Sequence, residues 1–141
     1  MKSRMLACLL VAVGLSTSGA AEDSEGENID DLDESVAPKH CISLPRIDRT
    51  EILDNQNILF FMKGGKIYQN RLPHKCPGLA RRDTFMYRTS LSQLCNVDII
   101  TVLDDIGFGF SPGASCGLGQ FYPRTTDQVE ALKADAVRNK Q

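Results

Sequence analysis

The sequence is short of the features that identify several large functional classes. It contains no Cys-x-x-Cys pair, only two histidines, and no hydrophobic run longer than the 11 residues from Met5 to Leu15. The missing Cys-x-x-Cys argues against a thioredoxin-like redox site and against structural zinc, whose ligands are usually closely spaced. The hydrophobic run is too short to cross a bilayer, which takes about 20 helical residues. The formal net charge of -2 gives the chain no strongly basic character for nucleic-acid binding.

Residues 1–21 have the order of a secretory signal peptide. Lys2 and Arg4 form a positive start, the apolar run follows, and the small residues of STSGAA supply a cleavage site after Ala20 or Ala21. We therefore predict a periplasmic or secreted protein with no transmembrane anchor after cleavage. A retained anchor is the alternative, and the short apolar run disfavours it.

Export changes what the five cysteines indicate. Cys8 lies in the predicted signal peptide and leaves with it, so four cysteines remain in the exported chain. An even number in an oxidising compartment predicts two disulfides, and four cysteines allow three pairings between which the sequence does not choose. The four are Cys41, Cys76, Cys95 and Cys116. A metal site built from His40-Cys41 and His74-x-Cys76 is the alternative, but its spacing is looser than that of structural zinc, so we predict no metal and no cofactor.

Residues 22–39 are predicted to form an acidic leader ahead of one folded domain, residues 40–141. Eight acidic residues, no basic residue and no aromatic side chain lie between Glu22 and Pro38. Such a segment buries too little apolar surface to offset its ordering entropy, which predicts a disordered, solubilising leader. An arm that binds a partner or folds back on a basic face is the alternative.

The domain has the pattern of short strands separated by turns. The β-prone runs 57–63 and 66–72 flank Gly64-Gly65, which predicts a hairpin with a two-residue turn, because glycine reaches the positive φ of primed turns. Further strands are predicted at 84–88 and 97–103, weaker ones at 41–44, 50–53 and 118–122, and the glycine-rich stretch 107–119 as a loop.

One helix is predicted over residues 126–139, capped by Asp127 with Glu130. Its apolar side is formed by Val129, Leu132, Ala136 and Val137. Together these elements predict a mainly β fold: a small antiparallel sheet or barrel, stapled by disulfides, with the C-terminal helix packed on the sheet and closing an edge.

Two features of the glycine-rich stretch suggest chemistry but have simpler explanations. Residues 113–117 fit the Gly-x-Ser-x-Gly pattern of a hydrolase nucleophile elbow, yet both histidines precede Ser115, whereas that fold places its histidine after the serine. We therefore predict no catalytic residue here. Phe108 and Phe110 suit ligand contact, but packing onto the sheet as a lid is the favoured interpretation, because large aromatic side chains reduce their exposure.

The best functional lead is a basic segment between Arg71 and Arg88, in which Asp83 is the single acidic residue. Arginine beside aromatic side chains suits phosphate, carboxylate-bearing polymers or single-stranded nucleic acid, and export disfavours nucleic acid as the partner. A solvated face is the alternative. The candidate ligand-binding residues are Arg71, Lys75, Arg81, Arg82, Tyr87 and Arg88.

Several short motifs of the core are also familiar. They are Asn70-Arg71-Leu72-Pro73, Cys76-Pro77-Gly78-Leu79, Leu94-Cys95 and Cys116-x-Leu118-Gly119. With them, residues 41–121 resemble a family of small exported bacterial proteins that has no assigned function. The resemblance implies one domain with four core cysteines at set places, and no catalytic residues.

The expected function is that of an exported binding or accessory module of the cell envelope. Its ligand is unknown, and we expect an anionic envelope component or a protein partner that contacts the basic segment. A small secreted enzyme with an unidentified active site is the alternative.

Overall fold

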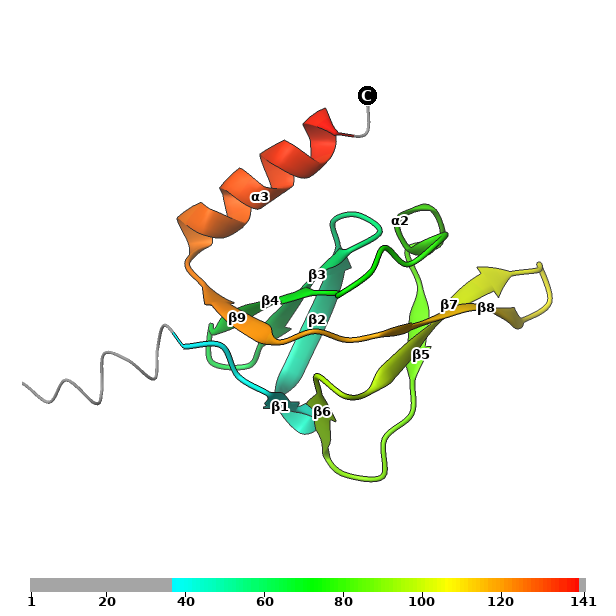
Figure 1. Cartoon of the computed structure of the whole chain (residues 1–141), viewed down its shortest axis with the longest axis horizontal. Coiled ribbons are helices and arrows are strands. Elements are labelled where there is room, and N and C mark those ends of the chain that lie inside the picture. The colour runs from blue at the N-terminus through cyan, green and yellow to red at the C-terminus, as the bar shows by residue number, and fades with distance from the viewer. Residues whose placement is uncertain (1–36, 140–141) are drawn as a thin grey trace, which may run out of the picture.

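The computed structural model describes residues 37–139, which form three small antiparallel sheets followed by a C-terminal helix (Figure 1). The predicted signal peptide and the predicted leader up to residue 36 lie outside the described residues. Within residues 37–139, no helix is long and apolar enough to cross a membrane. The mainly β fold predicted from the sequence is confirmed, as three sheets.

The sheets combine strands that are distant in sequence. The first sheet contains, in spatial order, β2 (Ile47–Ile52), β3 (Asn57–Met62), β4 (Ile67–Arg71) and β9 (Phe121–Arg124). The second contains β5 (Phe85–Tyr87), β7 (Ile99–Asp105) and β8 (Phe110–Gly117), and the third pairs β1 (Cys41–Ser43) with β6 (Gln93–Cys95). The helical elements are η1 (Leu44–Arg46), α2 (Leu79–Arg82) and α3 (Thr126–Arg138).

Strand β3 is covered on both faces because its side chains alternate. Ile58, Phe60 and Met62 face the main core, which lies between the first sheet and the rest of the domain. There the rings of Phe60 and Phe121 meet edge to face, with their centroids 5.5 Å apart. Leu59 and Phe61 face the other way, toward α3. After Asn57 the strand is therefore apolar throughout, as a strand buried on both sides requires.

Helix α3 covers a face of the first sheet, not an edge. Its buried Val129 and Ala136 pack with Leu59 of β3, whereas Val137, predicted on the same side, is 61% exposed. The predicted cap is also wrong: Thr125 accepts a hydrogen bond from the backbone of Gln128, whose side chain accepts one from Thr125. This reciprocal pair is a capping box that begins two residues before the predicted pair of Asp127 and Glu130.

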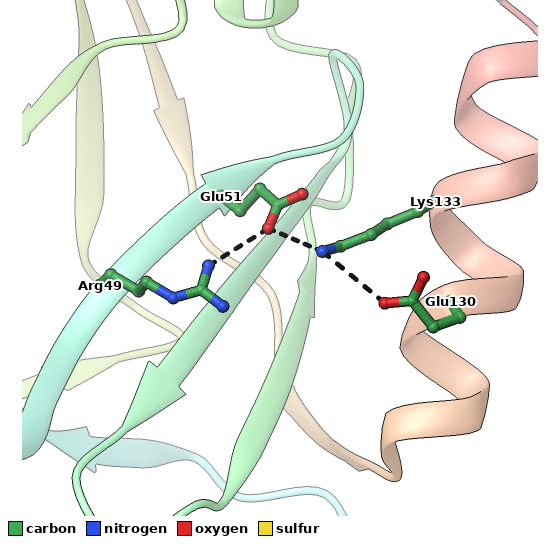
Figure 2. A network of polar contacts seen from close by, with 4 residues as sticks. All are labelled: Arg49, Glu51, Glu130 and Lys133. Carbon is green, nitrogen blue, oxygen red and sulfur yellow. Dashed lines mark hydrogen bonds and ion pairs between the residues drawn. The ribbon is translucent and has the colours of Figure 1, made fainter.

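Ion pairs also link α3 to the face of the first sheet that it covers. Glu51 of β2 accepts from Arg49 at 3.3 Å and lies 3.1 Å from Lys133 of α3 (Figure 2). The Arg49 guanidinium also lies 3.6 Å from the ring centroid of Phe61. Each partner is at least partly exposed, so the network orients the helix more than it stabilises the fold.

The structure contains both predicted disulfides and settles their pairing as Cys41–Cys95 and Cys76–Cys116. Cys41 and Cys95 are direct partners across the β1–β6 pair. The second bridge joins the fully buried Cys76, in the loop after β4, to β8.

Two local predictions need correction. The β3–β4 loop has three residues, because Met62 N–H donates to the Lys66 carbonyl at 2.8 Å, although Gly64 and Gly65 do adopt positive φ. Most of the glycine-rich stretch predicted as a loop is strand β8. Gly113 permits this pairing, since a Cβ there would lie only 3.2 Å from the Val102 carbonyl oxygen of β7.

Candidate functional site

The six residues predicted to bind an anion lie at separate places on the described surface. Arg71 ends β4, and Lys75 lies in the following loop, where it lines a pocket of about 240 Å³ with His74 and Ser115. Tyr87 and Arg88 line a shallow pocket of about 160 Å³ at the end of β5. The remaining two, Arg81 and Arg82, form the last turn of α2. Each of these pockets therefore holds at most two of the six.

The turn between β2 and β3 holds this basic segment in place. The Asn55 carbonyl accepts from Cys76 N–H at 2.6 Å, and the Asn55 side chain accepts from Ala80 N–H at 2.9 Å. Gln56 and Leu72 exchange a second pair of hydrogen bonds. Because α2 is anchored in this way, Arg82 forms an ion pair with Asp104 of β7, which partly neutralises one of the predicted ligand-binding cations.

Ser115 does not have the surroundings of a nucleophile elbow. It lies within strand β8, and its hydroxyl is 2.9 Å from that of Thr101 on β7. A nucleophile elbow is a sharp turn between a strand and a helix. The Gly-x-Ser-x-Gly match is therefore part of a β-ladder.

The predicted aromatic lid is wrong. Phe108 is 92% exposed and Phe110 is 61% exposed, at the tip of the β7–β8 hairpin (Figure 1). The hairpin extends beyond the core, so its tip has no apolar layer beneath it. Hydrogen bonds from Ile106 N–H to the Gly109 carbonyl and from Gly107 N–H to Asp105 shape the turn without help from either ring.

Phe108→Ser is accordingly expected to change the free energy of unfolding by no more than about 0.5 kcal/mol. The matched control is Phe121→Ala, which empties a fully buried site and should cost about 3–5 kcal/mol. Urea unfolding followed by circular dichroism measures both. A loss above 1 kcal/mol for Phe108→Ser would contradict its exposed position.

Four cations outside the predicted basic segment line one small pocket of about 190 Å³. We call it the basic pocket; its cations are Lys39, Arg46, Lys63 and Lys66. Arg46 ends η1, Lys63 and Lys66 flank the glycines of the β3–β4 loop, and Lys39 pairs with Phe121 of β9. The pocket is thus built where two segments of the chain meet, residues 39–46 and residues 62–68.

Hydrogen bonds dock the β3–β4 loop on η1. Lys63 N–H donates to the Arg46 carbonyl at 2.7 Å, and the Lys63 ammonium donates to the Pro45 carbonyl at 3.0 Å. The ammonium group has three N–H donors, so this bond leaves two of them for a ligand. The backbone, more than the flexible side chains, brings Arg46 and Lys63 together.

The electrostatics of the basic pocket are one-sided. Among residues 37–139, no acidic residue lines it and no ion pair involves Arg46, Lys63 or Lys66. The rest of its lining includes the buried side chains of Ile42, Met62 and Tyr68. Cations gathered beside a partly apolar lining suit an anionic group attached to a small non-polar body.

The basic pocket is not predictable from the sequence, because its cations are separated by up to 27 positions along the chain, from Lys39 to Lys66. The one local signal is Lys63-Gly-Gly-Lys66, where a tight loop returns the second lysine beside the first.

Comparison with known proteins assigns no family to this chain. No family model, curated protein or solved structure matches this chain. The resemblance of residues 41–121 to a family of small exported proteins stays a prediction. Within residues 37–139, no group of three or more His, Cys, Asp or Glu residues is placed to hold a metal ion.

Proposed function

We propose that this protein is an exported binding module that holds an anionic group of a cell-envelope component in its basic pocket. The observation that carries the proposal is the convergence of three exposed cations, Arg46, Lys63 and Lys66, on one small pocket that no acidic residue within 37–139 lines. Between Lys39 and Arg124 the chain has 11 basic and 7 acidic residues, and four of those 11 line the pocket. Two disulfides and the predicted signal peptide support an oxidising, exported location.

The residues of the basic pocket would contact an anionic ligand in different ways. The planar guanidinium of Arg46 presents paired N–H donors that match a phosphate or carboxylate. Lys63 and Lys66 act as point charges on either side of the tight loop, and both are exposed enough to reach a ligand. Ile42 and Met62 offer apolar contact to the carbon atoms that carry the anion.

The basic segment from Arg71 to Arg88 stays a second prediction for the same class of partner. Arg71, Lys75, Arg81 and Arg88 are exposed. Their scatter over separate pockets favours weak contact with an extended polyanion over capture of one anionic group. Variants of the two surfaces therefore distinguish the two sites.

The double variant Lys63→Gln/Lys66→Gln is expected to weaken binding of tripolyphosphate and citrate at least tenfold, or about 1.4 kcal/mol. Each lost cation removes charge-assisted hydrogen bonds, and exposure to solvent moderates the loss. Isothermal titration calorimetry at low salt measures the dissociation constants. Raising the salt concentration should weaken binding to the unsubstituted protein as well.

The control variant is Arg81→Gln/Arg88→Gln, which removes the same number of charges from the basic segment. It should change binding less than twofold. Greater loss in the control than in the pocket variant would assign the anion to the basic segment, and absence of binding by the unsubstituted protein would refute the proposal. Equal urea midpoints establish that neither variant acts through unfolding.

A further inference from the structure

A groove of about 680 Å³ separates edge strands of two different sheets. All six residues of β2 line one side, and residues from the end of α2 to β5 line the other. We call this the edge groove; beyond β2 its lining residues are Ala80, Asp83, Thr84, Phe85 and Tyr87. None of its lining residues belongs to the basic pocket.

Strand β2 presents unpaired backbone groups to the edge groove. Within residues 37–139 it pairs with β3 alone, and the bond from Leu53 N–H to the Asn57 carbonyl fixes which of its residues face β3. Hydrogen-bonded and non-hydrogen-bonded pairs alternate in an antiparallel ladder. Glu51 therefore bonds to β3, whereas Thr50 and Ile52 direct their N–H and C=O groups away from it.

Strand β5 does the same from the opposite side. Of the strands that the structure describes, only β7 pairs with it, and the bond from Leu103 N–H to the Thr84 carbonyl sets the alternation. Phe85 and Tyr87 consequently direct their backbone groups away from β7, and both residues line the groove. Among the described residues, no backbone hydrogen bond outside the ladders uses Thr50, Ile52, Phe85 or Tyr87.

The side chains around the edge groove combine apolar and acidic character. Half-buried Ile47, Ile52 and Phe85 pack against the main core and also line the groove. Glu51 is already engaged by Arg49 and Lys133 (Figure 2). Asp48 and Asp83 form no ion pair with any residue in the described range, so the charge left open in the groove is negative.

We propose that the edge groove binds an extended segment of a partner protein, which adds to β2 as a further strand and places Lys or Arg beside Asp48 and Asp83. Unpaired N–H and C=O groups along a strand are matched by another extended backbone, which is how sheet edges recognise peptides. The six residues of β2 span about 20 Å and would pair with a segment of similar length.

Two other occupants fit less well. Residues 22–38 of this chain carry eight acidic and no basic residues, so the acidic groove repels them. The β2 edge of a second copy would bring its own sheet behind it, toward the far side of the groove, where β5 and residues of α2 already lie. A basic segment that belongs to no sheet avoids both the charge repulsion and the clash with a second sheet.

The probe is a library of blocked heptapeptides with Val, Ile, Thr or Tyr at alternate positions and random residues between them. Peptides of this library are selected for binding to the oxidised protein, produced without its predicted signal peptide. Thr50→Pro removes an outward N–H and leaves the ladder to β3 intact, whereas the control Thr50→Val keeps that N–H. Asp48→Asn/Asp83→Asn removes the open charge with little change of shape, and asparagine tolerates the positive φ of Asp83.

We expect selected peptides to be enriched in Lys and Arg and to slow amide exchange at Thr50 and Ile52. Thr50→Pro and the double Asn variant should each weaken binding at least tenfold, and Thr50→Val less than twofold. If Thr50→Pro does not fold, the affinity of the double Asn variant for the selected peptides tests the proposal. Failure to select peptides, unchanged affinity in the Asn variant, or enrichment of acidic peptides would overturn the proposal. Concentration-dependent dimerisation that protects the same amides would also overturn it, by making a second copy the occupant.

Discussion

Alanine at Gly119 is expected to lower the free energy of unfolding by about 3 kcal/mol or more. Gly119 lies between β8 and β9, and a Cβ atom there would overlap the carbonyl oxygen of Arg71. That oxygen belongs to the backbone of β4, which is held between β3 and β9, so it cannot move aside as the end of a flexible side chain can.

The side chain of Asn70 prevents Gly119 from moving instead. Asn70 is fully buried, accepts from Gly119 N–H at 2.9 Å and donates to the Gly119 carbonyl at 2.6 Å. A shift that relieved the overlap would break both bonds and leave buried polar groups unsatisfied, at about 1–3 kcal/mol for each group.

Gly117→Ala is the matched control, because a Cβ at Gly117 meets no atom within 4 Å and the residue does not adopt positive φ. It should change the free energy of unfolding by less than about 1 kcal/mol. Urea unfolding of the two variants compares the positions directly. Similar midpoints would contradict the close approach of Gly119 to β4.

Removal of the Cys76–Cys116 bridge is expected to cost about 4 kcal/mol, from the chain entropy of a loop of this length. The two cysteines are separated by 40 positions. Because Cys76 is fully buried among the main-core residues, a substitution there also disturbs packing. Domains of this size are stable by about 5–15 kcal/mol, so the loss would leave the fold marginal.

The comparison is between Cys76→Ala/Cys116→Ala and Cys41→Ala/Cys95→Ala. The second pair closes a longer loop of 54 positions, but both of its cysteines are only half-buried. Chain entropy alone predicts that either double variant loses about 4 kcal/mol of the free energy of unfolding. A larger loss for Cys76→Ala/Cys116→Ala would therefore measure the contribution of Cys76 to core packing. Thiol alkylation followed by intact mass must first show no free cysteine in the protein produced without its predicted signal peptide. A loss below 1 kcal/mol for the first pair would contradict its role as a staple.

The sequence predicted best where neighbouring residues decide the structure. The apolar spacing of residues 126–139 predicted α3 to within one residue, and Gly64-Gly65 between β-prone runs predicted the β3–β4 hairpin. Its errors arose where a distant segment decides. Gly113 and its neighbours form a strand because β7 lies alongside, and Val137 is exposed because the first sheet contacts the adjacent side of the helix, where Ala136 packs.

The same division applies to function. The net charge of -2 averages the acidic residues 22–38 with a basic stretch from Lys39 to Arg124, and this basic stretch favours anionic partners. The order of the residues then favoured Arg71 to Arg88, where cations are neighbours in sequence. In the structure, α2 brings Arg82 to Asp104, while the docking of the β3–β4 loop on η1 gathers Arg46, Lys63 and Lys66.

By itself, the sequence determined the fold class and the presence of two disulfides, because strand periodicity and an even cysteine count are local or compositional properties. Only the tertiary structure decided which cysteines pair, which cations share a pocket and which strand edges are left open. Each of these depends on the approach of segments tens of residues apart, and that approach is set by packing the apolar faces of all three sheets into one core.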